Sequence, residues 1–556
     1  MIETNTESLP ASREAVHAQY RRNGWWRDRT FLDDLRDTVR SRPDRPAVIA
    51  RDTSGGDDVT RTLTYAELAA MTDRCAGALT ELGVRPGDFV AVQLPNRWEL
   101  VPLMLGCMRV GARLCPLVTD YRRRELEYML RLTEARVFIT MSDAKGTPLG
   151  EMALELAADL PNLRHVLVTA GPDGKVPHGA LDFEETVFGT EWEHGYQTEH
   201  ELGPDDPCLI LFTSGTTGEP KGVLHTMNTL HSAVRAEADV FELGGDSVIS
   251  IASIYTGGSA IMQGMLIPLL RGGTAAFQDT WAGPQLLELI ERHHVTFLFA
   301  TPTYLLDLLD AQRARPRDTS SLRHIATGSA PIPPHLVDEV REVFGVRLSA
   351  IWAMTENLAT TMTRLDDPDD WAKHSDGRPI DSMEVRIAPL PGAPEGDGGR
   401  LLSRGASQCL GYYRRAELYA THLDADGWFM TGDLARPDGR GGIRITGREK
   451  DLVMPRGFPV PVTEVEAVLG THPNIREVAV IGIRGTDDEV LCAVVTAVGE
   501  PPSLRELRDY LDEAGMTKLF WPERLEVVDT LPKTITGKIR KTELQQWYQN
   551  PAPPAN

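Results

Sequence analysis

A loop of small hydroxyl and glycine residues that ends in a lysine is the part of this sequence best suited to chemistry. It reads Thr213-Ser-Gly-Thr-Thr-Gly-Glu-Pro-Lys-Gly222 and directly follows the apolar run Cys208–Phe212, which predicts a buried strand. Backbone N–H groups freed by glycine, hydroxyl groups and one ammonium are what a polyphosphate needs. We therefore expect this loop to hold the phosphates of a nucleoside triphosphate.

The spacing within the loop does not fit the P-loop pattern. That pattern has four residues between its glycines and then Gly-Lys-Ser/Thr. Here Gly215 and Gly218 lie closer together, and Lys221 is followed by Gly222. The ten residues taken alone also leave open an ordinary surface turn.

The same ten residues resemble the phosphate loop of the adenylate-forming superfamily, which comprises acyl-CoA synthetases, luciferases and peptide-synthetase adenylation domains. They match every fixed position of its pattern T-S-G-T-T-G-x-P-K-G. Along nearly the whole chain, the likeness is greatest to medium-chain and cyclic-carboxylate CoA ligases. The resemblance implies that ATP is bound by Thr213, Ser214, Gly215, Thr216, Thr217, Gly218 and Lys221.

Further motifs resemble those with which this superfamily binds the rest of ATP. Ile351–Asn357 is similar to Y-G-x-T-E, which implies that Thr355 reaches the α-phosphate and Glu356 holds Mg²⁺. Alone, that Thr-Glu pair would indicate a helix cap. Gly328-Ser-Ala-Pro331 resembles the adenine-contacting turn, so its Gly328, Ser329 and Ala330 are expected to bind the base.

The motifs toward the C-terminus contain the residues expected to bind ribose and to take part in catalysis. Gly427–Leu434 is similar to G-W-[FY]-x-T-G-D, with Asp433 expected on the ribose hydroxyls. In Gly447-Arg-Glu-Lys-Asp451, Arg448 is expected on ribose or phosphate, although it would otherwise indicate a surface charge. Lys450 occupies the family's hinge position. Lys538, in a segment like L-P-x-T-x-[ST]-G-K, is expected to bind the attacking oxyanion.

The sequence departs from this family in the segment that forms the acyl pocket. Related ligases read roughly S-P-x-x-H-x-T-G, whereas this chain has Ser253-Ile-Tyr-Thr-Gly-Gly-Ser-Ala260, with Gly257 at the position of the usual histidine. Ala353 replaces a family glycine. The pocket is therefore expected to be rebuilt, with walls from Tyr255, Gly257, Gly258, Trp352 and Ala353.

A second departure lies just past the expected hinge, where CoA ligases usually read G-G-E-N-I. This chain has Arg456-Gly-Phe-Pro-Val460, so a bulky and a stiff residue replace a flexible polar pair. Two enzymatic interpretations stay open. One is an ATP- and Mg²⁺-dependent acid–CoA ligase for a small cyclic, aromatic or medium-chain carboxylate. The other is an adenylating enzyme without CoA, which loads a carrier protein or activates nitrite for attack by an arylamine.

A third interpretation is a nucleotide-binding relative without catalysis. It is disfavoured because the expected phosphate, metal, ribose and catalytic residues are all in place. The residues in question are Thr355, Glu356, Asp433, Arg448 and Lys538.

The elements that must position these residues alternate between helices and short apolar strands, which predicts an α/β fold with parallel sheets layered with helices. By resemblance, we expect an N-terminal adenylation domain over 1–447, with two layered β/α subdomains and a small β-barrel. A hinge over 448–451 and a mobile α+β lid over 452–556 should follow. The uncharged run Val248–Leu270 is interrupted by Gly257-Gly258 and predicts a strand, a loop and a buried helix.

Composition narrows the class of partner. The chain has 556 residues and a net charge of -22, which disfavours nucleic acid and anionic lipid as partners. Its six cysteines are scattered, without a C-x-x-C pair, and predict buried thiols in a reducing compartment. We expect a cytoplasmic enzyme of secondary metabolism, monomeric or homodimeric, with a small oxyacid as substrate.

Overall fold

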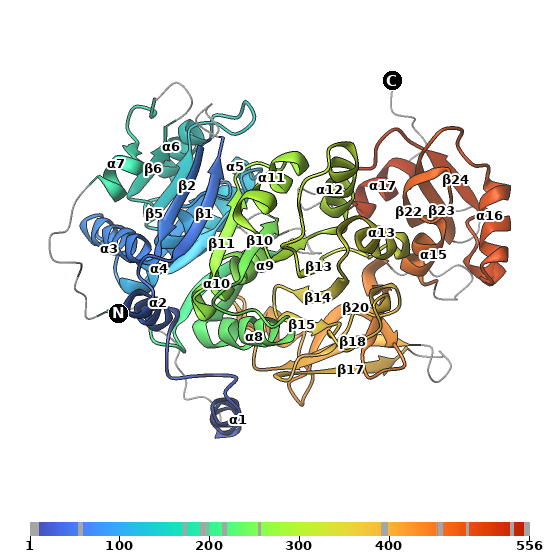
Figure 1. Ribbon diagram of the computed structural model, residues 1–556, viewed down its shortest axis with the longest axis horizontal. Coiled ribbons are helices and arrows are strands. Elements are labelled where there is room, and N and C mark those ends of the chain that lie inside the picture. The colour runs from blue at the N-terminus through green and yellow to red at the C-terminus, as the bar shows by residue number, and fades with distance from the viewer. Residues whose placement is uncertain are drawn as a thin grey trace.

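The computed structural model describes most of the chain and resolves two large sheets, an antiparallel sheet beside them and a C-terminal α+β unit (Figure 1). The described residues are 11–53, 59–170, 175–189, 196, 200–213, 219–253, 257–390, 398–451, 453, 460–484, 489–533 and 539–549. In Figure 1 the two large sheets lie at the left and centre, and the C-terminal unit lies at the right.

One large sheet has nine strands and is parallel through its centre, with antiparallel pairs at both ends. In spatial order the strands are β16 (Arg378–Pro379), β15 (Leu358–Met362), β14 (Leu348–Met354), β13 (His324–Gly328), β12 (Phe297–Ala300), β10 (Val248–Ala252), β11 (Thr274–Gln278), β1 (Pro46–Asp52) and β2 (Val59–Thr64).

The other large sheet has eight strands, and its antiparallel end carries the phosphate-loop flanks. In spatial order the strands are β19 (Gly411–Tyr412), β9 (Lys221–Thr226), β8 (Pro207–Thr213), β4 (Arg113–Pro116), β3 (Phe89–Gln93), β5 (Val137–Met141), β6 (His165–Thr169) and β7 (Leu181–Asp182). The predicted strand Cys208–Phe212 is thus confirmed as β8.

Two smaller sheets complete the molecule. The part predicted as a small barrel contains a four-stranded antiparallel sheet. The C-terminal unit contains a three-stranded mixed sheet, in which β22 and β23 are antiparallel and β23 and β24 are parallel. Their strands are β17 (Met383–Pro389), β18 (Gly399–Gly405), β20 (Phe429–Pro437) and β21 (Ile443–Arg448), then β22 (Ile475–Arg484), β23 (Glu489–Ala497) and β24 (Arg524–Val527).

Helices fill the spaces around these sheets. Those before the C-terminal unit are α1 (Ala11–Arg22), α2 (Phe31–Ser41), α3 (Tyr65–Glu81), α4 (Leu100–Arg109), α5 (Arg123–Thr133), α6 (Leu149–Asp159), α7 (Phe183–Phe188), α8 (Met227–Val240), α9 (Gly258–Ile261), α10 (Ile267–Arg271), α11 (Gly283–His293), α12 (Pro302–Ala314), α13 (Pro334–Phe344) and α14 (Ala416–Ala420). Those of the C-terminal unit are α15 (Val462–Leu469), α16 (Leu504–Glu513) and α17 (Lys541–Gln549). A π-helical turn, η1 (Met262–Leu266), separates α9 from α10, and 3₁₀ turns are η2 (Trp371–Lys373), η3 (Glu449–Asp451) and η5 (Lys518–Phe520).

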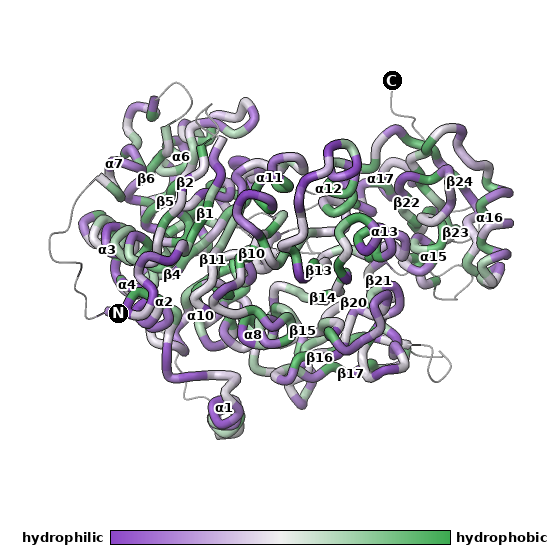
Figure 2. Tube along the Cα trace, in the orientation of Figure 1, coloured by the Kyte–Doolittle hydropathy of each residue, from purple (hydrophilic) through white to green (hydrophobic). Residues whose placement is uncertain are grey.

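Both large sheets pack against helices on their two faces. Successive residues of a strand point to opposite faces, so neighbouring residues join different apolar clusters. In β3, Val90 and Val92 join the central apolar cluster, which also holds residues of α2, α3, α4 and α8, while Phe89 joins an outer cluster with α5 and α6. In β12, Phe297 joins the central cluster and Leu298 an outer one with α11–α13. Figure 2 shows hydrophobic colour along the interior strands. The result is a layered α/β fold, as predicted.

Local signals in the sequence account for several of these elements. Thr64 caps α3, accepting a hydrogen bond from the Glu67 backbone while the Glu67 carboxylate accepts one from Thr64 N, 2.7 Å away. The uncharged run Val248–Leu270 forms β10 followed by the buried α9–η1–α10 segment. All six cysteines are buried free thiols.

In the part of the chain that the structure describes, no helix combines the length and the apolar character needed to cross a membrane.

Candidate active site

Lys221, the last side chain of the predicted phosphate loop, is held by aromatic residues from another part of the chain. It pairs with Thr213 across the antiparallel β8–β9 ladder. Its Nζ atom lies 3.3 Å from Nε2 of His422 and 4.9 Å from the ring centroid of Tyr412. Burial lowers the pKa of Lys221. The predicted loop residues 214–218, between Thr213 and Lys221, lie outside the described residues.

His422 is oriented so that it accepts a hydrogen bond from Lys221. Its Nδ1 atom lies 2.9 Å from the Leu418 carbonyl oxygen, which can only accept, so Nδ1 carries the proton. In the neutral imidazole, Nε2 is then an acceptor facing the lysine ammonium. The ring stacks on Phe429 and meets Tyr412 edge to face, each with centroids 5.7 Å apart. These contacts fix both the position and the tautomer of the imidazole.

Glu356, the predicted Mg²⁺ ligand, belongs to the same cluster. Its carboxylate is buried, and Oε1 accepts a hydrogen bond of 2.8 Å from the Tyr412 hydroxyl. Burial and the neighbouring Glu356 carboxylate raise the pKa of Tyr412, so the phenol stays protonated and donates. A carboxylate held in this way fits Mg²⁺, which prefers oxygen ligands.

The backbone at Thr355 is held by a buried histidine. Nε2 of His225 donates to the Thr355 carbonyl oxygen over 2.8 Å, so Nδ1 accepts from the Thr229 hydroxyl, 3.1 Å away. Burial lowers the pKa of His225 to about 4, which keeps the ring neutral. Three residues on, Leu358 has φ 56°, a left-handed conformation that non-glycine residues seldom adopt. The Thr355–Glu356 turn is therefore fixed on both sides.

Asp433, the predicted ribose acceptor, is anchored by two donors. Trp352 donates from Nε1 to Oδ2 over 2.9 Å, and Arg448 Nε lies 3.2 Å from Oδ1. The β20–β21 register places Asp433 directly opposite Arg448. Trp352 was predicted to line the substrate pocket, and the structure places its indole nitrogen at Asp433. Two predicted site residues, Trp352 and Arg448, thus contact a third, Asp433.

The predicted adenine turn has the backbone that such a turn needs. At Gly328, the last residue of β13, a Cβ atom would lie 2.2 Å from the Ile351 carbonyl oxygen, so only glycine fits. Ser329 follows with φ 67°, and Ala330 is partly buried next to it. Strain of this kind concentrates at ligand-binding positions.

Gly257, Gly258 and Ala353 lie near the contact between α9 and β15, whereas Trp352 packs against residues of the four-stranded sheet. Gly257 caps α9, and Gly258 begins it with its Cβ position 3.3 Å from Leu211 of β8. Ala353 packs against the central cluster, which also contains Ala260 of α9. Tyr255 lies outside the described residues. Small residues therefore occupy the part of the fold in which the sequence predicts the acyl pocket.

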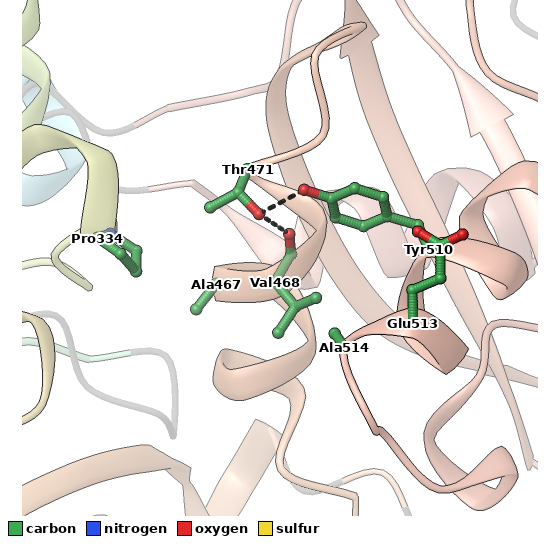
Figure 3. Close-up of a pocket in the computed structure, with 7 residues that line it drawn as sticks. All are labelled: Pro334, Ala467, Val468, Thr471, Tyr510, Glu513 and Ala514. Atoms are coloured by element: carbon green, nitrogen blue, oxygen red, sulfur yellow. Dashed lines mark hydrogen bonds between the residues drawn. The ribbon is translucent and has the colours of Figure 1, made fainter.

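The C-terminal unit contacts the rest of the chain beside this site. Arg436 of β20 pairs with Glu464 of α15, with Nε and Oε1 3.0 Å apart. A cavity of about 380 Å³ lies between Pro334 of α13 and the helices α15 and α16 (Figure 3). Thr471 and Tyr510 share a 3.0 Å hydrogen bond there. None of the predicted site residues lines this cavity, which is a crevice where the two parts of the chain meet.

Several predicted residues of the hinge and lid cannot be placed. Lys538 lies outside the described residues, between Lys533 and Ile539, which form an antiparallel bridge. Lys450 lies in η3, and its side chain is outside the described set. The segment 454–459, with the departure from the CoA-ligase pattern, is also outside it.

Three residues of this cluster were not singled out from the sequence: His225, Tyr412 and His422. His225 carries a weak signal, because it is a polar residue within a strand that is otherwise buried. Tyr412 and His422 carry none, since their partners lie 56 and 201 residues away along the chain.

Sequence comparisons agree with this geometry. A family described as AMP-binding enzyme matches residues 35–413, and the AMP-binding enzyme C-terminal domain matches 464–538. The chain is 30% identical to a medium-chain fatty-acid–CoA ligase of Escherichia coli (strain K12), over 98% of this chain and 95% of that one. It is 32% identical to a salicyl-AMP ligase/salicyl-S-ArCP synthetase of Mycobacterium tuberculosis (strain ATCC 25618 / H37Rv), over 96% and 93%.

A solved structure is also similar to this chain over nearly its whole length. ATP-bound MatB from Rhodopseudomonas palustris is similar with a TM-score of 0.81 and 26% identity, covering 94% of this chain and 99% of that one. The phosphate-loop flanks, the fixed Thr355–Glu356 turn and the anchored Asp433 thus occur in a chain that matches its relatives almost end to end. The chain belongs to the AMP-binding enzyme family and is an AMP-forming, adenylate-forming ligase.

Proposed function

We propose that this enzyme uses ATP and Mg²⁺ to convert a small carboxylic acid into its acyl adenylate, with release of pyrophosphate. The observation that carries the proposal is the linked cluster of Lys221, Tyr412 and Glu356. It ties a phosphate-binding ammonium to a buried carboxylate through one phenol. Transfer to an α-phosphorus depends on positioning and charge neutralisation more than on a protein nucleophile. A rigid cluster of this kind supplies both.

Each predicted residue then has a separate task. Lys221, with the loop Thr213–Gly218, holds the phosphates that leave as pyrophosphate, and Thr355 contacts the α-phosphate. Glu356 holds Mg²⁺, which would supply charge neutralisation on the phosphate oxygens. Asp433 binds the ribose, and Gly328, Ser329 and Ala330 bind the base. Arg448 adds positive charge beside Asp433, and Lys538 arrives with a C-terminal lid (452–556) that turns about Lys450.

The substrate class follows from the pocket and from the relatives. Gly257, Gly258 and Ala353 carry little or no side chain, so we expect the pocket beside the α9 segment to admit a ring or a short chain. The two relatives described above are named for a medium-chain fatty acid and for salicylate. We infer a small aromatic, cyclic or medium-chain acid.

The acceptor of the second half-reaction is a separate matter. Gly257 where related ligases have histidine, and Arg456–Val460 in place of the usual G-G-E-N-I, favour an acceptor other than CoA. The candidates are a carrier-protein thiol and, if the activated oxyacid is nitrite, an arylamine.

One assay distinguishes these outcomes. AMP and pyrophosphate release from ATP is measured with a panel of carboxylates, with and without CoA, and with nitrite plus an arylamine. Hydroxylamine traps an acyl adenylate as its hydroxamate. We expect hydroxamate with at least one carboxylate. AMP release that requires nitrite, with no hydroxamate from any acid, would replace the carboxylate with nitrite as substrate.

A further inference from the structure

Two polar side chains share a hydrogen bond inside the apolar core between α8 and η1. Glu237 of α8 is fully buried and Gln263 of η1 is 1% exposed. Gln263 donates from Nε2 to Glu237 Oε1 over 2.7 Å. The other oxygen of each side chain, Glu237 Oε2 and Gln263 Oε1, has no hydrogen-bond partner in the described part of the chain. Buried polar atoms are nearly always paired, so an unpaired one destabilises the fold unless a ligand satisfies it.

The protonation of Glu237 determines what this pair offers to a ligand. Burial raises the pKa of Glu237 to about 8, so the carboxyl group is mostly protonated at neutral pH. Because Oε1 accepts from Gln263, the proton resides on Oε2. The unpaired atoms are therefore one hydroxyl donor, Glu237 Oε2–H, and one amide acceptor, Gln263 Oε1.

Gln263 lies in η1, directly after α9, the short helix that begins in the predicted acyl pocket, and Glu237 lies on the neighbouring α8. Gly257 caps α9, and Ser259, one turn before Gln263, is partly exposed. α9 packs against β15, and η1 packs against α8. Ala353, beside the Thr355–Glu356 turn, contacts the same apolar cluster as Ala260 and Met262. A π-helical turn, often found at functional sites, replaces the regular helix where Gln263 lies.

We propose that Glu237 and Gln263 form a specificity subsite that binds a hydroxyl or amino substituent of the carboxylic acid being activated. The inference rests on the proposed function, because it assigns the far end of the substrate to this end of the pocket. A hydroxyl group donates to Gln263 Oε1 and accepts from Glu237 Oε2–H. An amino group donates to Gln263 Oε1. An unsubstituted ring or alkyl chain leaves both atoms unpaired, which disfavours it.

The test compares substituted and unsubstituted acids in wild-type enzyme and in a double variant. Glu237→Leu with Gln263→Leu replaces both partners by apolar groups of similar size, a change that preserves folding better than removing one partner. Hydroxamate formation gives kcat/KM for benzoate, for the three hydroxybenzoates, for the three aminobenzoates and for octanoate. Gln312→Leu is the control, because this buried glutamine bonds to the Arg317 backbone elsewhere in the fold.

We expect the wild type to prefer one hydroxy- or amino-substituted acid over its unsubstituted counterpart. In the double variant the ratio of the two kcat/KM values should fall by about 10–100-fold, the scale of one or two hydrogen bonds at about 1–3 kcal/mol. The control should keep the wild-type ratio. Glu237→Met with Gln263→Met gives a second pair of apolar replacements if the first double variant is unstable, and its ratio should also fall. Glu237→Gln keeps one acceptor and one donor at this position and should keep the wild-type ratio.

The outcomes separate the two proposals. If the wild type forms hydroxamates but the ratio is unchanged in the double variants, or if all acids lose activity equally, the subsite is wrong and the proposed function stands. If no acid gives a hydroxamate, the proposed function fails and the subsite fails with it.

Discussion

Lys221 Nζ lies 3.3 Å from Nε2 of His422, and the same imidazole is bound through Nδ1 to the Leu418 carbonyl oxygen. This relationship joins the end of the phosphate loop to a residue 201 positions later in the chain. A lysine side chain loses about 1.5–2 kcal/mol of rotamer freedom when it is fixed. His422 restricts Lys221 before a nucleotide arrives, so part of that loss precedes binding.

His422→Phe tests this restriction. Phenylalanine keeps the ring between Tyr412 and Phe429 but cannot accept from Lys221, so more rotamer freedom must be lost on binding ATP. We expect the KM for ATP to rise about fivefold, which corresponds to roughly 1 kcal/mol. His472→Phe is the control, since His472 contacts Tyr510 in the C-terminal unit. An unchanged KM in a stably folded His422→Phe protein would show that the contact does not orient the lysine.

Trp352→Phe tests the anchoring of Asp433. The variant keeps an apolar ring but removes the indole N–H that bonds Oδ2 over 2.9 Å. A hydrogen bond to a charged group contributes about 1.5–3 kcal/mol, so kcat/KM for ATP should fall by at least about tenfold. The measurement is ATP-dependent pyrophosphate release at varied ATP concentrations.

Trp428→Phe is the matched control for that change. Trp428 directly precedes β20, the strand of Asp433, but contacts Arg386 and Arg404, whose guanidinium carbons lie 4.7 and 4.6 Å from its ring centroid. The Trp428→Phe variant should keep kcat/KM for ATP near the wild-type value. Equal effects of the two substitutions would mean that Trp352 acts through packing and not through Asp433.

Local signals in the sequence predicted the elements, whereas the contacts that fix the site depend on distant segments. The capping box of Thr64 and Glu67 spans three residues, and the predicted strand Cys208–Phe212 lies within β8. These depend on neighbouring residues alone. The phosphate-loop flanks are similarly local, since Thr213 and Lys221 lie at the ends of paired strands.

The side-chain contacts that sequence reasoning missed all depend on tertiary structure. Trp352 reaches Asp433 across 81 residues, and Gln263 reaches Glu237 from a different helix. In the sequence, Gln263 is one polar residue in an uncharged run, which indicates a buried helix and nothing about its partner. The hydropathy pattern of the sequence predicts that this segment is buried. The partner of a buried polar side chain depends on how the helices pack against one another.

The buried carboxyl group of Glu237 predicts a dependence of stability on pH. Its pKa is raised from 4.5 to about 8 in the folded protein, so the folded state binds more protons than the unfolded state between these values. Stability is therefore fully present below about pH 4.5 and is lost as pH rises toward 8. The loss is about 3 kcal/mol at pH 7, from 1.36 kcal/mol per pH unit.

Glu237→Gln removes this proton linkage and keeps the side-chain shape. We expect the variant to gain stability relative to the wild type as pH rises from 5 to 8, measured as the free energy of unfolding in urea. Glu417→Gln, at an exposed position on α14, is the control. Its free energy of unfolding should change with pH in the same way as that of the wild type. A difference between Glu237→Gln and wild type that stays constant across this pH range would contradict the assignment of a protonated Glu237.

Lys538→Ala tests the lysine expected to bind the attacking oxyanion. Removing one preorganised charge-stabilising group costs about 10²–10³ in rate, so adenylate formation should fall by at least that factor. The measurement is hydroxamate formation under saturating ATP and acid, which isolates the first half-reaction from the acceptor. Lys541→Ala is the control, because Lys541 of α17 pairs with Glu466 at 2.6 Å. Near-normal adenylation by Lys538→Ala, with Lys541→Ala also normal, would remove Lys538 from the catalytic residues and require another cation to meet the oxyanion.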